Sequence, residues 1–84
     1  MYKIVFTKQA EKDLRRVAAS PLKNKALRLL SVLEDDPYLP PWEKLVDLEN
    51  TYSRRINIQH RLVYQIDEPT KTIKIIRMWT HYGD

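Results

Sequence analysis

The spacing of apolar residues changes once along this chain, near Tyr52, and that change constrains the fold more than any other feature. Before Tyr52, two segments repeat apolar residues three and four positions apart, which is typical of amphipathic helices. After it, apolar and polar residues alternate, which is typical of strands that bury one face. Helices followed by strands indicate an α+β domain.

The two helical segments are separated by only a few residues. Thr7 suits the N-cap of the first helix, and Ser20-Pro21 suits the start of the second, with proline at the first helical position. The first apolar stripe consists of Ala10, Leu14, Val17 and Ala18. The second consists of Leu22, Ala26, Leu29, Leu30 and Leu33. We therefore expect an antiparallel helical hairpin whose apolar faces pack on one partner.

Four segments are expected to form strands: residues 2–6, 52–57, 60–66 and 71–80. The order is thus β-α-α-β-β-β, with the last three strands forming a meander. We predict that the helical hairpin packs on one face of a mainly antiparallel, four-stranded twisted sheet, whose other face is partly open. A chain of 84 residues builds one such domain, residues 1–84, around one core.

Residues 36–51 form a long irregular segment, and loops of this length in small domains are often functional. Its prolines are Pro37, Pro40 and Pro41. An alternative interpretation is a strap over the sheet edge, with its apolar side chains in the core. These side chains are Trp42, Leu45 and Leu48. The two interpretations are compatible, because prolines and a buried tryptophan would hold a neighbouring side chain in place.

Composition excludes several kinds of chemistry. The chain has no cysteine, so disulfides, thiol catalysis and cysteine-based metal sites are excluded. Its single glycine rules out a Gly-rich phosphate loop, and two histidines are too few for a site of several imidazoles. We expect no metal and no cofactor. No apolar run approaches the ~20 residues that cross a bilayer, and no signal peptide is visible, so we expect a cytoplasmic protein without membrane contact.

Charge is unevenly distributed along the chain. Residues 34–49 contain six acids and one base, whereas the other 68 positions contain 14 bases and five acids, a net charge of +9. A small domain with this excess attracts polyanions, most commonly nucleic acid. A basic surface that is merely solvated remains the alternative.

Three arginines occur in the expected second and third strands. Arg54 and Arg55 are adjacent and must point to opposite faces of the sheet. If an odd number of residues connects the strands, Arg55 shares a face with Arg61. Arg54 then points to the helix side, where its stem packs while its head reaches solvent. Two arginines side by side either hold an anion between them or are solvated charge.

Acid–base candidates flank these arginines. Glu43 lies in the irregular segment, and His81-Tyr82 follow the last strand. Each has a simpler explanation, because loop glutamates usually face water and terminal residues usually fray. We expect structural roles for His60, Tyr64 and Trp79, the last as a core or sheet-edge anchor.

Three segments resemble a known family in order and spacing. Residues 52–64, Tyr-Ser-Arg-Arg-Ile-Asn-Ile-Gln-His-Arg-Leu-Val-Tyr, resemble the signature block of the YoeB/Txe toxins, a branch of the RelE/ParE superfamily. Residues 42–45, Trp-Glu-Lys-Leu, resemble the family's glutamate segment, and residues 79–82, Trp-Thr-His-Tyr, resemble its terminus. Residues 46–51 are one position shorter than usual, and Val46 stands where the family has a basic residue.

The resemblance implies a RelE-like microbial RNase fold and a type II toxin that cleaves mRNA in the ribosomal A site without metal. It implies a general base at Glu43, a general acid at His81, transition-state stabilisation by Arg61, a phosphate contact at Arg55 and the terminal tyrosine at Tyr82. Lys44 partly replaces the missing basic residue.

The resemblance also implies partners: mRNA and rRNA in the 30S A site, a YefM/Axe-like antitoxin, and a second copy of the chain in a homodimer. Two alternatives remain. One is a ParE-like toxin that binds DNA gyrase without chemistry of its own. The other is a catalytically inactive fold that only pairs with a DNA-binding partner.

Overall fold

The computed structural model describes residues 1–80, so the expected site residues His81 and Tyr82 lie outside the described residues. Its elements are β1 (Lys3–Phe6), α1 (Lys8–Ala18), α2 (Lys23–Asp35), β2 (Glu43–Lys44), β3 (Thr51–Arg55), β4 (Arg61–Asp67) and β5 (Thr72–Thr80). Within these residues, no helix is long and apolar enough to cross a membrane.

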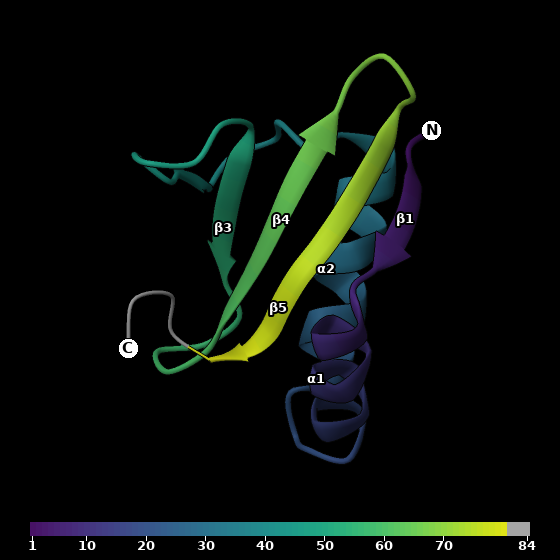
Figure 1. Cartoon of the computed structure of the whole chain (residues 1–84). Coiled ribbons are helices and arrows are strands. Elements are labelled where there is room, and N and C mark those ends of the chain that lie inside the picture. The colour runs from purple at the N-terminus through teal and green to yellow at the C-terminus, as the bar shows by residue number, and fades with distance from the viewer. Residues whose placement is uncertain (81–84) are drawn as a thin grey trace.

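The five strands form one sheet in the order β1-β5-β4-β3-β2, and both helices lie on one side of it (Figure 1). Only β1 and β5 pair in parallel; the other neighbours are antiparallel. The α+β class and the mainly antiparallel sheet are confirmed. The expected strand number was one too low, because β2 adds a two-residue edge strand that is too short to show alternation.

The two helices begin differently. The Thr7 hydroxyl accepts a hydrogen bond from the Ala10 N–H at 3.0 Å, which confirms the predicted N-cap of α1. The second helix begins at Lys23, so the prediction of Pro21 as its first residue was wrong. The Ser20 hydroxyl instead donates to the Val17 carbonyl at 2.8 Å and accepts from the Leu22 N–H at 3.1 Å. These bonds make Ser20-Pro21 part of the turn between the helices.

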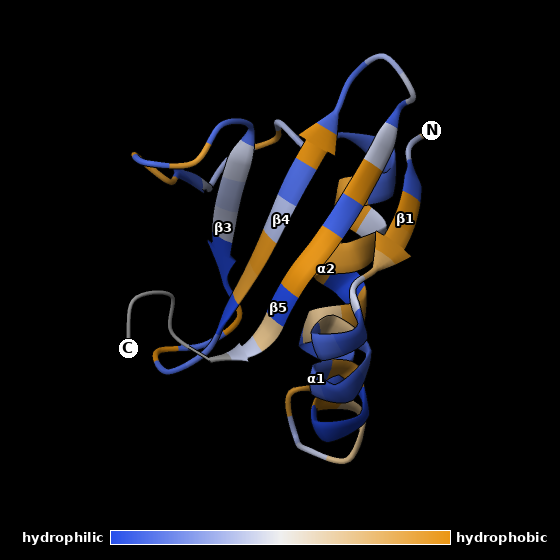
Figure 2. Ribbon diagram, in the orientation of Figure 1, coloured by the Kyte–Doolittle hydropathy of each residue, from blue (hydrophilic) through white to orange (hydrophobic). Residues whose placement is uncertain are grey.

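The core lies between the helices and the sheet. Apolar and polar residues alternate along much of β4 and β5 (Figure 2), and most of the apolar ones belong to the cluster that packs against the helices. The most buried side chains of this cluster include Val17, Ala26, Leu33, Leu62, Tyr64, Ile73, Ile75 and Met78. Each large apolar side chain that is fully buried contributes about 1.5–3 kcal/mol to folding. The opposite face of the sheet carries polar and charged side chains together with the buried Val63, which pairs with Ser53.

A buried carboxylate joins α1 to the free edge of β5. Strand β1 pairs with β5 only as far as Ile75. Beyond that point the Asp13 carboxylate accepts hydrogen bonds from the Met78 N–H at 3.0 Å and from Arg77 Nε at 2.9 Å. Burial raises the pKa of Asp13. The hydrogen bonds from the Met78 N–H and then from Arg77 lower it by a larger amount, so the pKa lies below its ordinary value.

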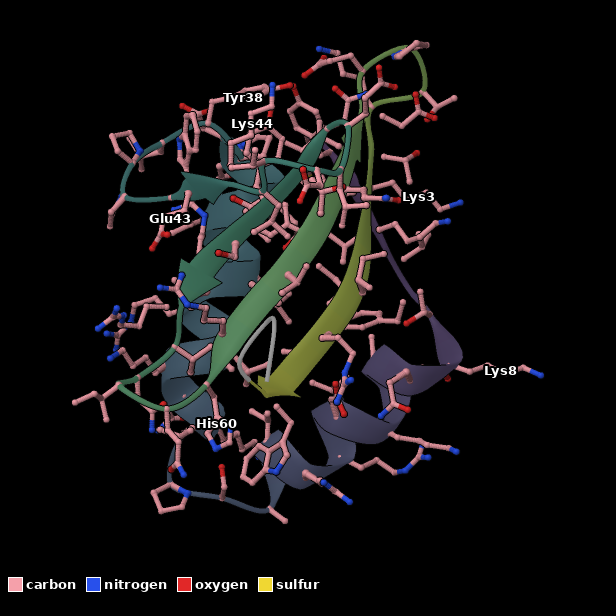
Figure 3. The ribbon with its side chains drawn as sticks, turned by 60° about the vertical axis from the view of Figure 1, so that its left-hand side comes forward. Lys3, Lys8, Tyr38, Glu43, Lys44 and His60 are labelled. Atoms are coloured by element: carbon pink, nitrogen blue, oxygen red, sulfur yellow. The ribbon has the colours of Figure 1, made fainter. Side chains whose placement is uncertain are left out.

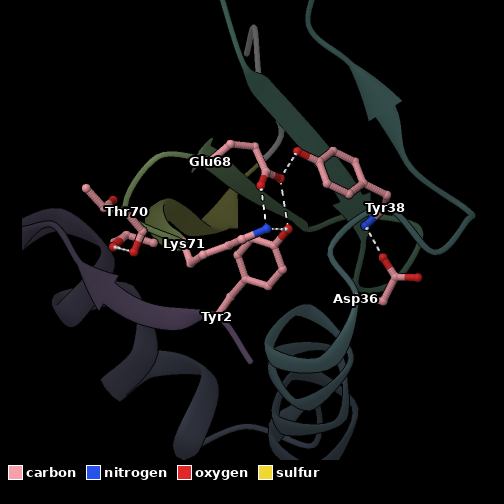
Figure 4. Close-up of polar contacts among 7 residues, drawn as sticks. Tyr2, Asp36, Tyr38, Glu68, Thr70 and Lys71 are labelled. Carbon is pink, nitrogen blue, oxygen red and sulfur yellow. Dashed lines mark hydrogen bonds and ion pairs between the residues drawn. The ribbon is translucent and has the colours of Figure 1, made fainter.

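A second polar cluster ties the start of the chain to the turn between β4 and β5 (Figure 4). The Glu68 carboxylate accepts hydrogen bonds from the hydroxyls of Tyr38 and Tyr2, the latter at 2.8 Å, and from Lys71 Nζ at 2.9 Å. The Tyr38 hydroxyl, then Lys71 and Tyr2, lower the pKa of Glu68 from 4.5 to about 2. This cluster anchors the first part of the segment that leads to Glu43.

Candidate active site

Glu43 and Arg61 meet on the open face of the sheet, although their strands are separated by β3. The Arg61 guanidinium donates through Nη2 to Glu43 Oε1 at 2.8 Å and through Nη1 to the Ser53 hydroxyl at 3.0 Å. Glu43 pairs with Ser53 in the β2–β3 register, which places both on one face. The Arg61 side chain is 19% exposed and that of Glu43 is 66% exposed, so this ion pair is open to solvent.

Arg55 lies directly opposite Arg61 in the β3–β4 register. Five residues, 56–60, connect the two strands, so the predicted odd connection and the shared face are confirmed. Arg55 is exposed and Arg61 is half-buried. Because Glu43 carries one negative charge beside two guanidinium groups, the cluster keeps a net positive charge that attracts a phosphate.

Arg54 points to the helix side, as predicted, but its head does not reach solvent. The residue is only 3% exposed, so the prediction of a solvated head was wrong. Its guanidinium donates to the Tyr64 hydroxyl at 3.0 Å, to the Pro37 carbonyl at 3.0 Å and to the Pro41 carbonyl at 3.3 Å. The loop that carries these two carbonyls covers the head and supplies its hydrogen-bond partners.

Trp42 lies outside the core, contrary to the strap interpretation. It is 37% exposed, Leu48 is 40% exposed and Leu45 is half-buried. The indole packs edge-on against Tyr52, with ring centroids 5.2 Å apart, and its Nε1 donates to the Tyr38 carbonyl at 2.8 Å. Trp42 is therefore fixed at the sheet edge rather than buried beneath it.

A pocket of about 280 Å³ opens between this loop and the end of β3. Its apolar wall is formed by Leu29, Pro41 and Trp42, and its charged wall by Glu43, Arg55 and Arg61. Strand β2 pairs with β3 only at Tyr52 and Ser53, so the two segments diverge beyond that point. An apolar wall beside guanidinium groups suits a ligand that joins a flat ring to a phosphate.

Lys44 is next to Glu43 on β2, but its register position opposite Tyr52 places it on the other face of the sheet (Figure 3). The structure thus brings together Glu43, Arg55 and Arg61 but not Lys44. His81 and Tyr82 lie outside the described residues. The residue before His81, Thr80, pairs with Arg61 in the β4–β5 register, so the chain enters its last residues from a position beside the site.

One contributor to the site was missed by the sequence analysis. Ser53 receives a hydrogen bond from Arg61, and strand alternation would have placed it on the face of Arg55. His60 precedes β4 rather than belonging to it, and its ring stacks on Trp79 with centroids 4.3 Å apart. These two aromatic rings pack on each other at the end of the sheet that leads to His81.

Comparison with known proteins identifies the family. Residues 4–83 match the family described as the ParE toxin of the type II toxin-antitoxin system parDE. The chain belongs to this toxin family. It is a type II toxin-antitoxin toxin of the RelE/ParE superfamily, as the resemblance implied. A comparison with curated protein sequences found no match.

Solved structures of this superfamily have the same fold. The YoeB dimer from Staphylococcus aureus is 34% identical, with a TM-score of 0.82 over 96% of this chain and 98% of that one. A YoeB–YefM complex from the same organism is also 34% identical, with a TM-score of 0.78 over 98% and 99%. The YoeB/ParE toxin from Agrobacterium tumefaciens is 25% identical, with a TM-score of 0.85 over 95% and 99%.

Proposed function

We propose that this toxin is a ribosome-dependent endoribonuclease that cleaves mRNA in the A site and thereby inhibits translation. The observation that supports this most strongly is the contact between Glu43 and Arg61 at 2.8 Å, with Arg55 directly opposite Arg61. The three side chains supply a proton acceptor and two phosphate ligands within one patch. The 34% identity to a YoeB toxin adds independent support.

RNA carries its own nucleophile, the 2′-hydroxyl beside the scissile phosphate. In the proposed reaction Glu43 accepts the 2′-hydroxyl proton while the O2′–P bond forms. Arg61 and Arg55 donate hydrogen bonds to the phosphorane oxygens and offset their developing charge. The P–O5′ bond then breaks, and the leaving oxygen takes a proton from the imidazolium of His81. The products are a 2′,3′-cyclic phosphate, or its opened 3′-phosphate, and a 5′-hydroxyl.

Two further residues have proposed roles in binding RNA. Tyr82 stacks on a base or donates a hydrogen bond to a phosphate oxygen. Lys44, which is exposed on the other face of the edge strand, contacts a more distant phosphate of mRNA or rRNA. Activity on the ribosome places the toxin in the cytoplasm.

An antitoxin is the second proposed partner. The solved structures similar to this chain include a YoeB–YefM complex and the RelBE complex from Escherichia coli. We propose that an acidic segment of a YefM/Axe-like antitoxin folds onto the basic face that carries Arg55 and Arg61. Homodimerisation is proposed from the YoeB dimer. Co-purification with a small acidic protein from the same operon is the expected result.

The competing function is a ParE-like inhibitor of DNA gyrase, and the description of the matched family favours it. The test is to map 5′-hydroxyl ends on a defined mRNA with and without ribosomes, beside a gyrase supercoiling assay. The nuclease proposal predicts new 5′-hydroxyl ends within the A-site codon only when ribosomes are present, and normal supercoiling. Inhibited supercoiling with intact mRNA would support the gyrase inhibitor instead.

A further inference from the structure

Arg54 is a buried cation that the proposed chemistry does not use. It is 3% exposed, and among residues 1–80 none of the ion pairs involves it. Within residues 1–80, its guanidinium contacts two carbonyls, one hydroxyl and the ring of Tyr64, whose centroid lies 6.0 Å from Cζ. Burying a charge without a counter-ion is costly, and such exceptions are expected at functional sites.

The two carbonyls belong to the segment that leads to Glu43. Three of its residues, Pro37, Pro40 and Pro41, have no backbone N–H, so the segment has few donors that could pair it with a strand. Its carbonyls can still accept hydrogen bonds, and Arg54 donates to those of Pro37 and Pro41. The second of these carbonyls lies only two residues before Glu43.

We propose that Arg54 is a positioning residue: its guanidinium fixes residues 37–41 through two carbonyls and thereby fixes where Trp42 and Glu43 enter the site. The planar fork of arginine suits this task, because it donates to three acceptors in different directions at once. Trp42 completes the arrangement by donating to the Tyr38 carbonyl in the same segment. The inference rests on the proposed nuclease function only for its effect on cleavage.

The position of the loop is measured independently of activity. The chain has two tryptophans, so in a Trp79→Phe background the emission comes from Trp42 alone. Arg54→Met is expected to shift the emission of Trp42 to longer wavelength and to increase its quenching by acrylamide, while far-UV circular dichroism stays the same. Lys3→Met removes one exposed charge on β1, at the edge of the sheet opposite β2, and is expected to leave the emission unchanged.

Cleavage is measured in single-turnover reactions on programmed ribosomes. Displacing a reacting group by about 1 Å lowers the rate on the order of 10²-fold, so Arg54→Met is expected to lower the rate constant by this factor. The half-saturating ribosome concentration should stay the same, because Arg55 and Arg61 are intact. A merely unstable variant would lose reaction amplitude but keep the rate constant of the folded fraction.

Two conservative variants guard against a failure of Arg54→Met to fold. Tyr64→Phe removes one acceptor and is expected to produce a smaller loss of the same kind. Arg54→Lys keeps the charge but not the fork, and it is expected to remain well below wild type in rate constant. A wild-type rate constant in Arg54→Lys or in a folded Arg54→Met, or unchanged Trp42 emission in the latter, would overturn the inference.

Failure of the proposed nuclease function and failure of the positioning role of Arg54 give different results. If the wild-type toxin cleaves no mRNA, the proposed function fails, and the emission of Trp42 alone decides whether Arg54 positions the loop. If Glu43→Gln loses cleavage while a folded Arg54→Met does not, the proposed function stands and the positioning role fails.

Discussion

The Arg61 guanidinium donates to the Glu43 carboxylate at 2.8 Å across β3, the strand that lies between theirs. The contact joins the edge strand β2 to the centre of the sheet. The second terminal nitrogen of Arg61, Nη1, donates to the Ser53 hydroxyl at 3.0 Å. The guanidinium is therefore already oriented before any phosphate binds. In the proposed reaction, Glu43 accepts a proton from the sugar attached to that phosphate.

Arg61→Ala is expected to lower the single-turnover cleavage rate on the order of 10²–10³-fold, as removal of an oxyanion-hole donor does. Arg61→Lys should not restore it, because a single ammonium lacks the fork that contacts both Glu43 and Ser53. Stability should change by only about 0–1 kcal/mol, since the ion pair is open to solvent. Full activity in Arg61→Lys would contradict this account.

Arg55→Gln is expected to weaken binding to programmed ribosomes and to reduce its dependence on salt. A lost phosphate contact lowers the slope of log affinity against log salt concentration by about 1. The measurement is a titration of labelled ribosomes at several salt concentrations. Lys3→Gln, on the edge strand β1 and separated from β3 by β5 and β4, should keep the wild-type slope. An unchanged slope in Arg55→Gln would remove Arg55 from the phosphate site.

Glu68→Gln is expected to make folding less sensitive to acid. The pKa of Glu68 is lowered to about 2 by Tyr38, Lys71 and Tyr2, so its ionised form is favoured in the folded state. Its contribution to stability is present above pH 4.5 and is lost as the pH falls toward 2. Denaturant unfolding at pH 7 and pH 3 should show a smaller loss in Glu68→Gln than in wild type.

The matched control for that measurement is Asp47→Asn, which neutralises an exposed carboxylate in the loop before β3. It should lose as much stability as the wild type between the two pH values. An equal loss in Glu68→Gln and in the wild type would show that the tyrosine–lysine cluster does not contribute.

Asp13→Ala is expected to destabilise the toxin by about 3 kcal/mol. It leaves the buried Met78 N–H without its acceptor and Arg77 without its ion pair. The measurement is the free energy of unfolding in urea. Glu11→Ala, which removes an exposed carboxylate two residues before Asp13 on α1, should change it by about 0.5 kcal/mol or less. Equal losses in the two variants would contradict the proposed edge contact.

Much of the fold follows from local rules. The N-cap of α1, the helical stripes and the alternation after Tyr52 each depend on near neighbours, and they predicted the order of the long elements. Arg55 and Arg61 share a face because an odd number of residues connects β3 to β4. These features are visible in a sequence because a helix turn or a strand repeat lies within a few residues.

The remaining features depend on residues far apart in the chain. Strand β2 is formed by pairing with β3, and nothing in its own two residues indicates a strand. The burial of the Arg54 head depends on carbonyls 13 and 17 positions away, in a segment whose path the sequence does not define. The exposure of Trp42 depends on the same path.

Single-turnover cleavage by Glu43→Gln and His81→Gln on programmed ribosomes tests the central proposal most directly. Each substitution removes one proton-transfer group, and each is expected to lower the rate constant on the order of 10²–10⁴-fold. Glu49→Gln, which neutralises an exposed glutamate in the same loop, should cleave at the wild-type rate. Wild-type cleavage by both Glu43→Gln and His81→Gln would contradict the assignment of acid and base.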